Sequence, residues 1–239
     1  MKIGLASCEY ITGNIIHNIS VINDCSKKHK IDMLLFGESF LHGFDGLTWD
    51  SENDFKIALE KDSSEINFIK KIATQNHIIL GVGYFEKFDG KIYDSYILID
   101  QFGKEIINYR RVSEGWKINK ADKKIYAEGN EFPIFKINDQ NFSIGLCGDF
   151  WHDDNIKKMK SITKDFVIWP LYINYSKETW ENEKYEYSKK ANLIGENVLL
   201  INSINKLPYE CFGGAIYFKN GIITKELKMG VNDVLIIEI

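Results

Sequence analysis

Three polar residues of reactive types occupy similar positions along the chain. Glu38, Arg111 and Cys147 each follow a run of apolar residues whose length is typical of a buried strand. Strand ends hold side chains at fixed separations beside loops, so a carboxylate, a cation and a thiol from three strands can converge in one pocket. The pattern therefore predicts a common site for these residues.

A carboxylate, a cation and a thiol together suit acyl transfer. The carboxylate can accept the proton of the thiol and later give it to a leaving amine. A fixed cation can stabilise the developing oxyanion, and the backbone N–H of Gly148, directly after the thiol, would add a donor. The residue types thus predict Cys147 as a nucleophile and Glu38 as its general base and acid.

Taken one at a time, these residues also have structural interpretations. Cys147 has the properties of a buried core thiol, and Glu38 with Arg111 those of a structural ion pair. The chain has four widely spaced cysteines, which form neither a disulfide framework nor a Cys-x-x-Cys motif. We therefore expect reduced thiols.

The first third of the chain alternates strand and helix patterns. A strand pattern at 2–7 precedes an apolar stripe at helical spacing, which follows Asn14 and runs to about residue 30. A short apolar run at 31–36 then predicts a buried strand. Asp62 and Glu65 have capping-box spacing and predict the start of a second helix.

From residue 78 onward the period becomes that of strands. Asp89-Gly90 and Asn220-Gly221 predict hairpin turns, and His152 with the two aspartates after it predicts a surface turn. A polar and aromatic segment at 176–196 predicts a helix. The predicted strands are 78–85, 92–99, 105–111, 142–146, 165–169, 198–202, 215–218, 222–226 and 234–239. This α+β pattern favours two sheets packed together with helices outside.

Composition and charge exclude several classes of function. The 30 basic and 34 acidic residues are mixed along the chain and give a formal net charge of −4. This distribution provides no basic patch that could bind nucleic acid. No apolar run reaches the roughly 18 residues of a membrane span, and the N-terminal run is too short for a signal peptide, so we expect a cytoplasmic protein. The five histidines lack metal-ligand spacing, and we expect no metal. Without a linker or repeat, residues 1–239 are expected to form one domain.

Six segments, in order along the chain, resemble motifs of the nitrilase (carbon–nitrogen hydrolase) superfamily. Phe36-Gly37-Glu38-Ser39-Phe40-Leu41-His42-Gly43-Phe44 resembles its Pro-Glu-x-Phe-x-x-Gly-[Tyr/Phe] segment. Asp94-Ser95, with Ile99-Asp100 and Gly103 after it, resembles Tyr-Asn-Ser followed by Ile-Asp-x-x-Gly. The others are Tyr109-Arg110-Arg111 for Tyr-Arg-Lys, Gly145-Leu146-Cys147-Gly148-Asp149 for Gly-x-x-Cys-x-Asp, the run from Ala191 to Asn202, and Phe212-Gly213-Gly214-Ala215.

The resemblance spans nearly the whole chain and implies a four-layer αββα sandwich. It implies that Cys147 is the nucleophile and Glu38 the general base and acid. It also implies assembly as homodimers or larger oligomers, and neither a metal nor an organic cofactor. The superfamily acts on non-peptide C–N bonds, so the expected partner is a small amide-like molecule.

One position departs from the superfamily pattern: Arg111 stands where the motif has lysine. A guanidinium keeps the positive charge and the donors, but it is larger and planar, so the exchange is not conservative. We expect Arg111 to take the role of the lysine, with Lys117 as the alternative. The superfamily often supplies a second acid from the following loop, where Glu114, Asp122 and Glu128 are the candidates.

These features predict a hydrolase of a small amide that works through a Cys147 thioester. The alternative is a catalytically impaired relative, in which Arg111 has abolished turnover and the protein binds a small ligand or a protein partner. The reactivity of the Cys147 thiol distinguishes these two hypotheses, because a nucleophilic thiol reacts with an alkylating agent and a core thiol does not.

Overall fold

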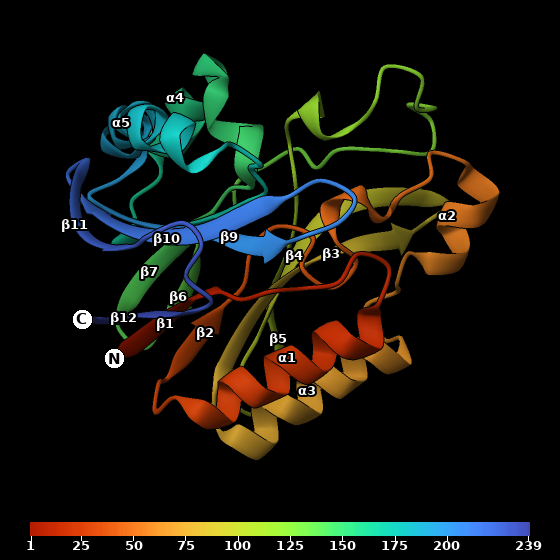
Figure 1. Ribbon diagram of the computed structural model, residues 1–239, viewed down its shortest axis with the longest axis horizontal. Coiled ribbons are helices and arrows are strands. Elements are labelled where there is room, and N and C mark those ends of the chain that lie inside the picture. Colours follow the sequence, from red (N-terminus) through yellow and green to blue (C-terminus); the bar gives the residue numbers. More distant parts are fainter.

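The computed structural model describes residues 1–239 and contains two six-stranded sheets packed between helices (Figure 1). Helices α1 (Ile15–Lys28) and α3 (Ser64–Asn76) cover the outer face of the first sheet. Helices α4 (Asp153–Ser161) and α5 (Lys177–Ile194) cover the second. The four layers confirm the predicted αββα sandwich.

The first sheet is built from the N-terminal half of the chain and the C-terminal strand. Strand β1 runs parallel to β2 and antiparallel to β12, β2 runs parallel to β3, and antiparallel pairing continues through β4 to β5. In spatial order the strands are β12 (Asp233–Glu238), β1 (Lys2–Ser7), β2 (Met33–Leu35), β3 (Ile79–Phe88), β4 (Lys91–Ile99) and β5 (Glu105–Arg110).

The second sheet takes the remaining strands. Three central strands, β7, β8 and β9, are parallel, and antiparallel strands flank them on both sides. In spatial order the strands are β11 (Ile222–Leu227), β10 (Cys211–Lys219), β9 (Asn197–Asn205), β8 (Phe166–Leu171), β7 (Gln140–Ile144) and β6 (Phe135–Ile137). The inner faces of the two sheets share one apolar core, in which Tyr96 and Phe142 are fully buried.

Short helices lie at the end of the sandwich where strands β2, β5 and β7 finish. They are α2 (Ser51–Ile57) and three 3-10 turns, η1 (Phe44–Gly46), η2 (Glu114–Trp116) and η3 (Cys147–Trp151). None of the helices combines the length and the apolar composition that a membrane crossing requires.

The sequence analysis was wrong about two local features. The cap of α3 is Ser63 rather than Asp62, because the Ser63 hydroxyl accepts the backbone N–H of Ile66 and the helix starts one residue later. His152 does not form a surface turn but directly precedes helix α4. Helix α2 was not predicted, because seven residues are too few to show a helical period.

Glycine at position 83 determines how closely the loop after β2 can approach β3. A Cβ on Gly83 would lie 2.2 Å from the backbone nitrogen of Ser39 and 2.8 Å from the carbonyl carbon of Glu38. The backbone of Leu41 then donates to the carbonyl of Gly83 at 3.0 Å. The absence of a side chain at Gly83 therefore lets the loop that carries Glu38 pack directly against β3.

Candidate active site

Glu38 is buried just beyond the end of β2, and both of its carboxylate oxygens are hydrogen-bonded. Arg111 donates to Oε1 from Nη1 at 2.8 Å, and the backbone N–H of Tyr172 donates to Oε2 at 2.8 Å. The backbone of Ser39 has a φ of +49°, which turns the chain sharply after the carboxylate. Glu38 is thus held by contacts from both sheets.

Cys147 begins the η3 turn with a φ of +37°, a left-handed conformation that costs a residue with a side chain about 1–3 kcal/mol. The thiol is half-buried and lies 3.7 Å from the carbonyl oxygen of Tyr172, to which it donates. The carbonyl of Cys147 accepts the indole N–H of Trp169 at 3.0 Å. These bonds hold a sharp turn that presents the sulfur beside the residue that binds Glu38.

The thiol of Cys147 is protonated in this arrangement. Burial raises its pKa above the ordinary value, the negative charge of Glu38 raises it further, and the charge of Arg111 opposes both. Cys147 is therefore a neutral thiol beside the carboxylate of Glu38 and not a thiolate. Such a thiol becomes a nucleophile when a base removes its proton during attack.

Arg111 is buried directly after β5, in contact with the carboxylate. Its Nη1 pairs with Glu38, its Nε donates to the hydroxyl of Ser113 at 2.9 Å, and Nη1 also lies 3.7 Å from Oδ2 of Asp94. Burial alone would lower the pKa of Arg111, but the neighbouring carboxylates reverse this effect and raise it. The guanidinium is a fixed positive charge.

Asp149 connects the loop that contains Arg111 to the turn that contains Cys147. Oδ1 accepts the backbone N–H groups of Val112 and Ser113, at 3.1 and 2.8 Å. Oδ2 accepts the backbone N–H of Leu146 at 2.7 Å and the hydroxyl of Tyr109 at 2.5 Å. One buried carboxyl group therefore sets the distance between the cation and the thiol.

Gly148 provides the space that the guanidinium of Arg111 occupies. A Cβ on Gly148 would lie 2.4 Å from Nη2 of Arg111, well inside contact distance. Any side chain at position 148 would therefore displace the guanidinium.

We expect Gly148→Ala to displace the guanidinium of Arg111 and to slow any reaction of Cys147 by about 10-fold or more, because Arg111 would lose its bond to Glu38. The measurement is the rate at which iodoacetamide labels Cys147. Gly115→Ala is the matched control, since its Cβ would lie at an ordinary 3.6 Å from the same nitrogen. Equal labelling of the two variants would contradict the proposed contact.

The structure does not bring the other candidates of the sequence analysis into this cluster. Glu114 is exposed and pairs with Lys123 at 2.8 Å. Lys117 pairs with Glu128 and donates to the carbonyl of Tyr126 at 3.0 Å.

Asp122 is likewise occupied with local contacts. It is exposed, and its side chain accepts the backbone N–H of Lys124 at 2.9 Å. Only Glu38, Arg111, Cys147 and Gly148, among the predicted site residues, lie together.

Tyr172 was not predicted as a site residue, because it lies in none of the six motif-like segments. Its ring stacks on Phe44, with centroids 4.6 Å apart and an interplanar angle of 10°. Its hydroxyl donates to Asp45 at 2.5 Å. The loops after β2 and β8 are thus joined beside the thiol.

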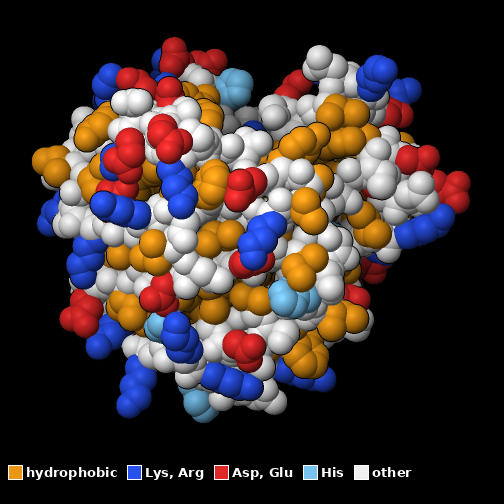
Figure 2. Space-filling model, viewed as in Figure 1, with side chains coloured by type: hydrophobic (Ala, Val, Ile, Leu, Met, Phe, Trp, Pro, Cys, Tyr) orange, Lys and Arg blue, Asp and Glu red, His pale blue; other side chains and the backbone are white.

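Access to the site is from the end of the sandwich that carries the short helices. Figure 2 shows the surface hollowed between the α4–α5 side and the loop that contains η2. Cys147 is half-buried, whereas Glu38 and Arg111 are buried. Cys147 is therefore the least buried of the three residues.

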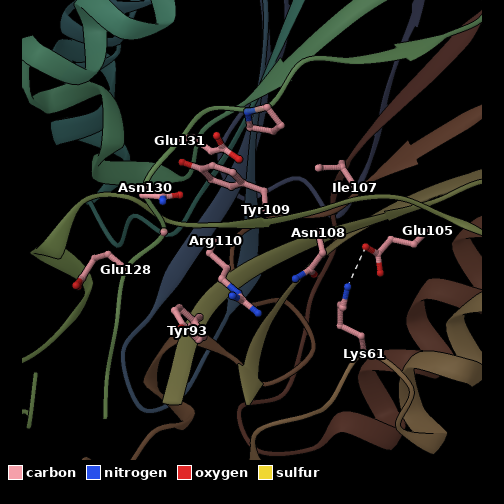
Figure 3. Close-up of a pocket in the computed structure, with 12 residues that line it drawn as sticks. Lys61, Tyr93, Glu105, Ile107, Asn108, Tyr109, Arg110, Glu128, Asn130 and Glu131 are labelled. Atoms are coloured by element: carbon pink, nitrogen blue, oxygen red, sulfur yellow. Dashed lines mark hydrogen bonds and ion pairs between the residues drawn. The ribbon is translucent and has the colours of Figure 1, made fainter. Parts of the chain in front are cut away.

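A separate pocket of ≈ 480 Å³ lies along edge strand β5 (Figure 3). Its lining is polar, and several of its charged groups are paired: Arg110 binds both carboxylate oxygens of Glu86 at 2.8 Å, and Lys61 pairs with Glu105 at 3.1 Å. None of its lining residues belongs to the Glu38, Arg111 and Cys147 cluster. No group of three or more His, Cys, Asp or Glu side chains has the geometry of a metal site.

Known proteins resemble this chain in sequence. The family described as Carbon-nitrogen hydrolase matches residues 3–239. A hydrolase encoded in the pqqF 5′ region of Pseudomonas protegens is 23% identical over 71% of the chain and 59% of its own length. A cyanide hydratase from Microdochium sorghi is 24% identical over 77% of the chain and 52% of its own length. The chain thus spans between half and three fifths of these relatives.

Solved structures share the fold. An amidase of the nitrilase superfamily from Nesterenkonia AN1 superposes with a TM-score of 0.83, at 16% identity, over 100% of the chain and 90% of the amidase. A carbon–nitrogen hydrolase from Helicobacter pylori G27 gives a TM-score of 0.79 at 16% identity, over 99% of the chain and 87% of that protein. With the family match over nearly all residues, the chain belongs to the carbon–nitrogen hydrolase family of the nitrilase superfamily.

Proposed function

We propose that this protein hydrolyses a small amide, with Cys147 as nucleophile, Glu38 as general base and acid, and Arg111 as the stabilising cation. One observation carries the proposal: a single residue, Tyr172, contacts both reacting groups. Its N–H binds the carboxylate of Glu38 and its carbonyl accepts the thiol of Cys147. The base and the nucleophile are therefore held in a fixed mutual position.

The first half of the reaction forms a thioester. Glu38 takes the proton of Cys147 while the sulfur attacks the carbonyl carbon of the amide. The oxygen gains negative charge, which Arg111 and the backbone N–H of Gly148 stabilise. The C–N bond then breaks, and Glu38 returns the proton to the leaving nitrogen, so that ammonia or an amine departs.

The second half restores the enzyme. Glu38 takes a proton from water, the resulting oxygen nucleophile attacks the thioester, and the C–S bond breaks. The thiolate of Cys147 recovers its proton from Glu38, and a carboxylic acid is released. The protons move between Glu38 and Cys147, which Tyr172 holds on either side of its own peptide groups, and no step requires a cofactor.

An amide is the preferred substrate class over a nitrile because the solved structures that share the fold include an amidase. In the Nesterenkonia amidase, a mutant structure shows acrylamide added at the active-site cysteine. Small unbranched amides are therefore the first compounds to screen.

The test is a time course of iodoacetamide labelling at neutral pH, read by peptide mapping, in the wild type and in Glu38→Gln. If Glu38 is the base, its loss slows labelling of Cys147, by about 10-fold or more. If Glu38 only repels the thiolate, its loss lowers the pKa of Cys147 and labelling becomes faster. The second result would contradict the proposal.

Cys25 provides an internal reference in the same digest. It is partly exposed, and the neighbouring Cys8 thiol, with sulfur atoms 3.2 Å apart, lowers its pKa by hydrogen bonding. Its labelling should therefore be measurable and independent of Glu38. Cys211 is buried, its pKa is raised to about 11 by burial, and it should label slowly.

A specific contact favours the second candidate function, an impaired relative that binds a ligand without turnover. Arg111 is already bonded to Glu38 and Ser113, so its guanidinium is engaged before any substrate enters. Under this alternative, an amide panel gives no ammonia although Cys147 still labels in a Glu38-dependent way. Ammonia release above that of Cys147→Ala would exclude it.

We also propose that the protein forms a homodimer through the outer face of the α4–α5 layer. That layer exposes Trp151, Tyr185 and Leu193, which are 41%, 59% and 42% accessible. Large exposed apolar side chains of this kind are typical of interfaces. Light scattering after size-exclusion chromatography measures the mass, and a monomer at micromolar concentration would contradict the proposal.

A further inference from the structure

A second carboxyl group, that of Asp94, lies inside the cluster and has one oxygen without a hydrogen-bond partner. Asp94 is on β4, with 0% of its surface exposed. Its Oδ1 accepts the hydroxyl of Ser39 at 3.0 Å. Its Oδ2 is buried and unpartnered. A buried carboxylate oxygen without a hydrogen-bond partner is energetically unfavourable, so the protonation state of Asp94 requires an explanation.

The unpartnered oxygen of Asp94 lies near the charged groups of Arg111 and Glu38. Oδ2 lies 3.7 Å from Nη1 of Arg111, and the same nitrogen lies 2.8 Å from Oε1 of Glu38. The backbone N–H of Arg111 also donates to the carbonyl of Asp94 at 2.9 Å. Two buried carboxyl groups therefore share one guanidinium.

No other group supplies a compensating positive charge. The remaining titratable neighbours of the guanidinium are Cys147, a neutral thiol, and Asp149, whose two oxygens each accept two donors of their own. With both Glu38 and Asp94 ionised, two negative charges would face one positive charge in a buried site. Two carboxyl groups in that position do not both ionise at neutral pH.

We propose, on the basis of the proposed function, that Asp94 is a positioning residue that holds a proton on Oδ2 and donates it in a hydrogen bond to Glu38. This proton gives the unpartnered oxygen a bond and leaves Glu38 as the single ionised carboxylate beside Arg111.

Electrostatic effects also favour a protonated Asp94 beside an ionised Glu38. Burial raises the pKa of Asp94 well above its ordinary range, the charge of Glu38 raises it further, and Arg111 opposes this only in part. Asp94 therefore stays neutral as pH falls from neutral and ionises as pH rises through its raised pKa. Ionised Asp94 competes with Glu38 for Arg111 and makes removal of the Cys147 proton harder.

The direct test is an infrared titration of the wild type against Asp94→Asn. At neutral pH, the difference spectrum should contain the band of one protonated carboxyl group, which disappears on raising the pH. This measurement does not depend on turnover, so it is independent of the proposed hydrolase function. Absence of the band in the wild type at neutral pH would overturn the proposal, even if the variants failed to fold.

The functional test uses the ratio of Cys147 labelling rates in Asp94→Asn and wild type, with Cys25 as the reference. We expect the ratio to stay within about 3-fold of one at neutral pH and to rise at alkaline pH, where only the wild type gains a negative charge. Asp165→Asn, at an exposed carboxylate, is the control. A 10-fold slower Asp94→Asn at neutral pH would show that the ionised form is needed, and would overturn the proposal.

Discussion

Replacing Cys147 with alanine is expected to reduce amide hydrolysis by about a thousand-fold or more, to the level of the buffer blank. The sulfur forms the covalent bond to the substrate, and no other side chain in contact with Glu38 can replace it. The measurement is ammonia release from a panel of small amides. The substitution removes a half-buried thiol whose only side-chain hydrogen bond is the long contact to Tyr172, so the fold should persist.

Cys211→Ala is the control for this experiment. Its thiol is buried and donates to the carbonyl groups of Ile173 and Ser203, each at 2.9 Å, so its loss should lower the melting temperature without removing activity. If Cys147→Ala kept more than a few per cent of the wild-type rate, a thioester mechanism would be wrong.

Glu38→Gln is expected to give the second largest loss, about 10²- to 10⁴-fold in the rate of amide hydrolysis. Glutamine cannot accept the thiol proton. It also presents an amide NH₂ to one of the two donors that Glu38 now accepts, those of Arg111 and Tyr172, so one bond of the site is broken. Steady-state rates should fall in kcat rather than in KM, because the base acts in the chemical step.

Glu86→Gln is the matched control, because Glu86 is also a buried carboxylate paired with an arginine. It receives two bonds from Arg110 at 2.8 Å on the helix-facing side of the first sheet. We expect this variant to lose stability and keep its rate. Comparable rate losses in both variants would assign the effect of Glu38 to folding rather than to proton transfer.

The layered fold was predictable because its signals are local. Apolar period-2 runs with Asp89-Gly90 and Asn220-Gly221 between them identify hairpins, and both turns have the positive φ values that this requires. Local signals also identified Glu38, Arg111 and Cys147 as residues that follow strands. The exact start of helix α3 was not predicted, because two neighbouring residues can both cap a helix, and Ser63 takes this role in place of Asp62.

The supporting residues of the site could not be predicted from spacing. Tyr172 is 134 positions from Glu38, and Asp94 meets Arg111 only because β4 and β5 pair in one particular register. Glu114 had the right residue type, but a nearby lysine at 123 pairs with it on the surface. Contacts between distant segments depend on how the two sheets are placed, and no motif encodes that placement.

The two parts of Tyr172 act separately. Its backbone groups hold Glu38 and Cys147, whereas its ring stacks on Phe44 and its hydroxyl binds Asp45 near the opening. A substitution here changes the ring while leaving the peptide groups in place. A substitution at residue 172 is therefore expected to change how the loops after β2 and β8 are joined, while the backbone bonds to Glu38 and Cys147 remain.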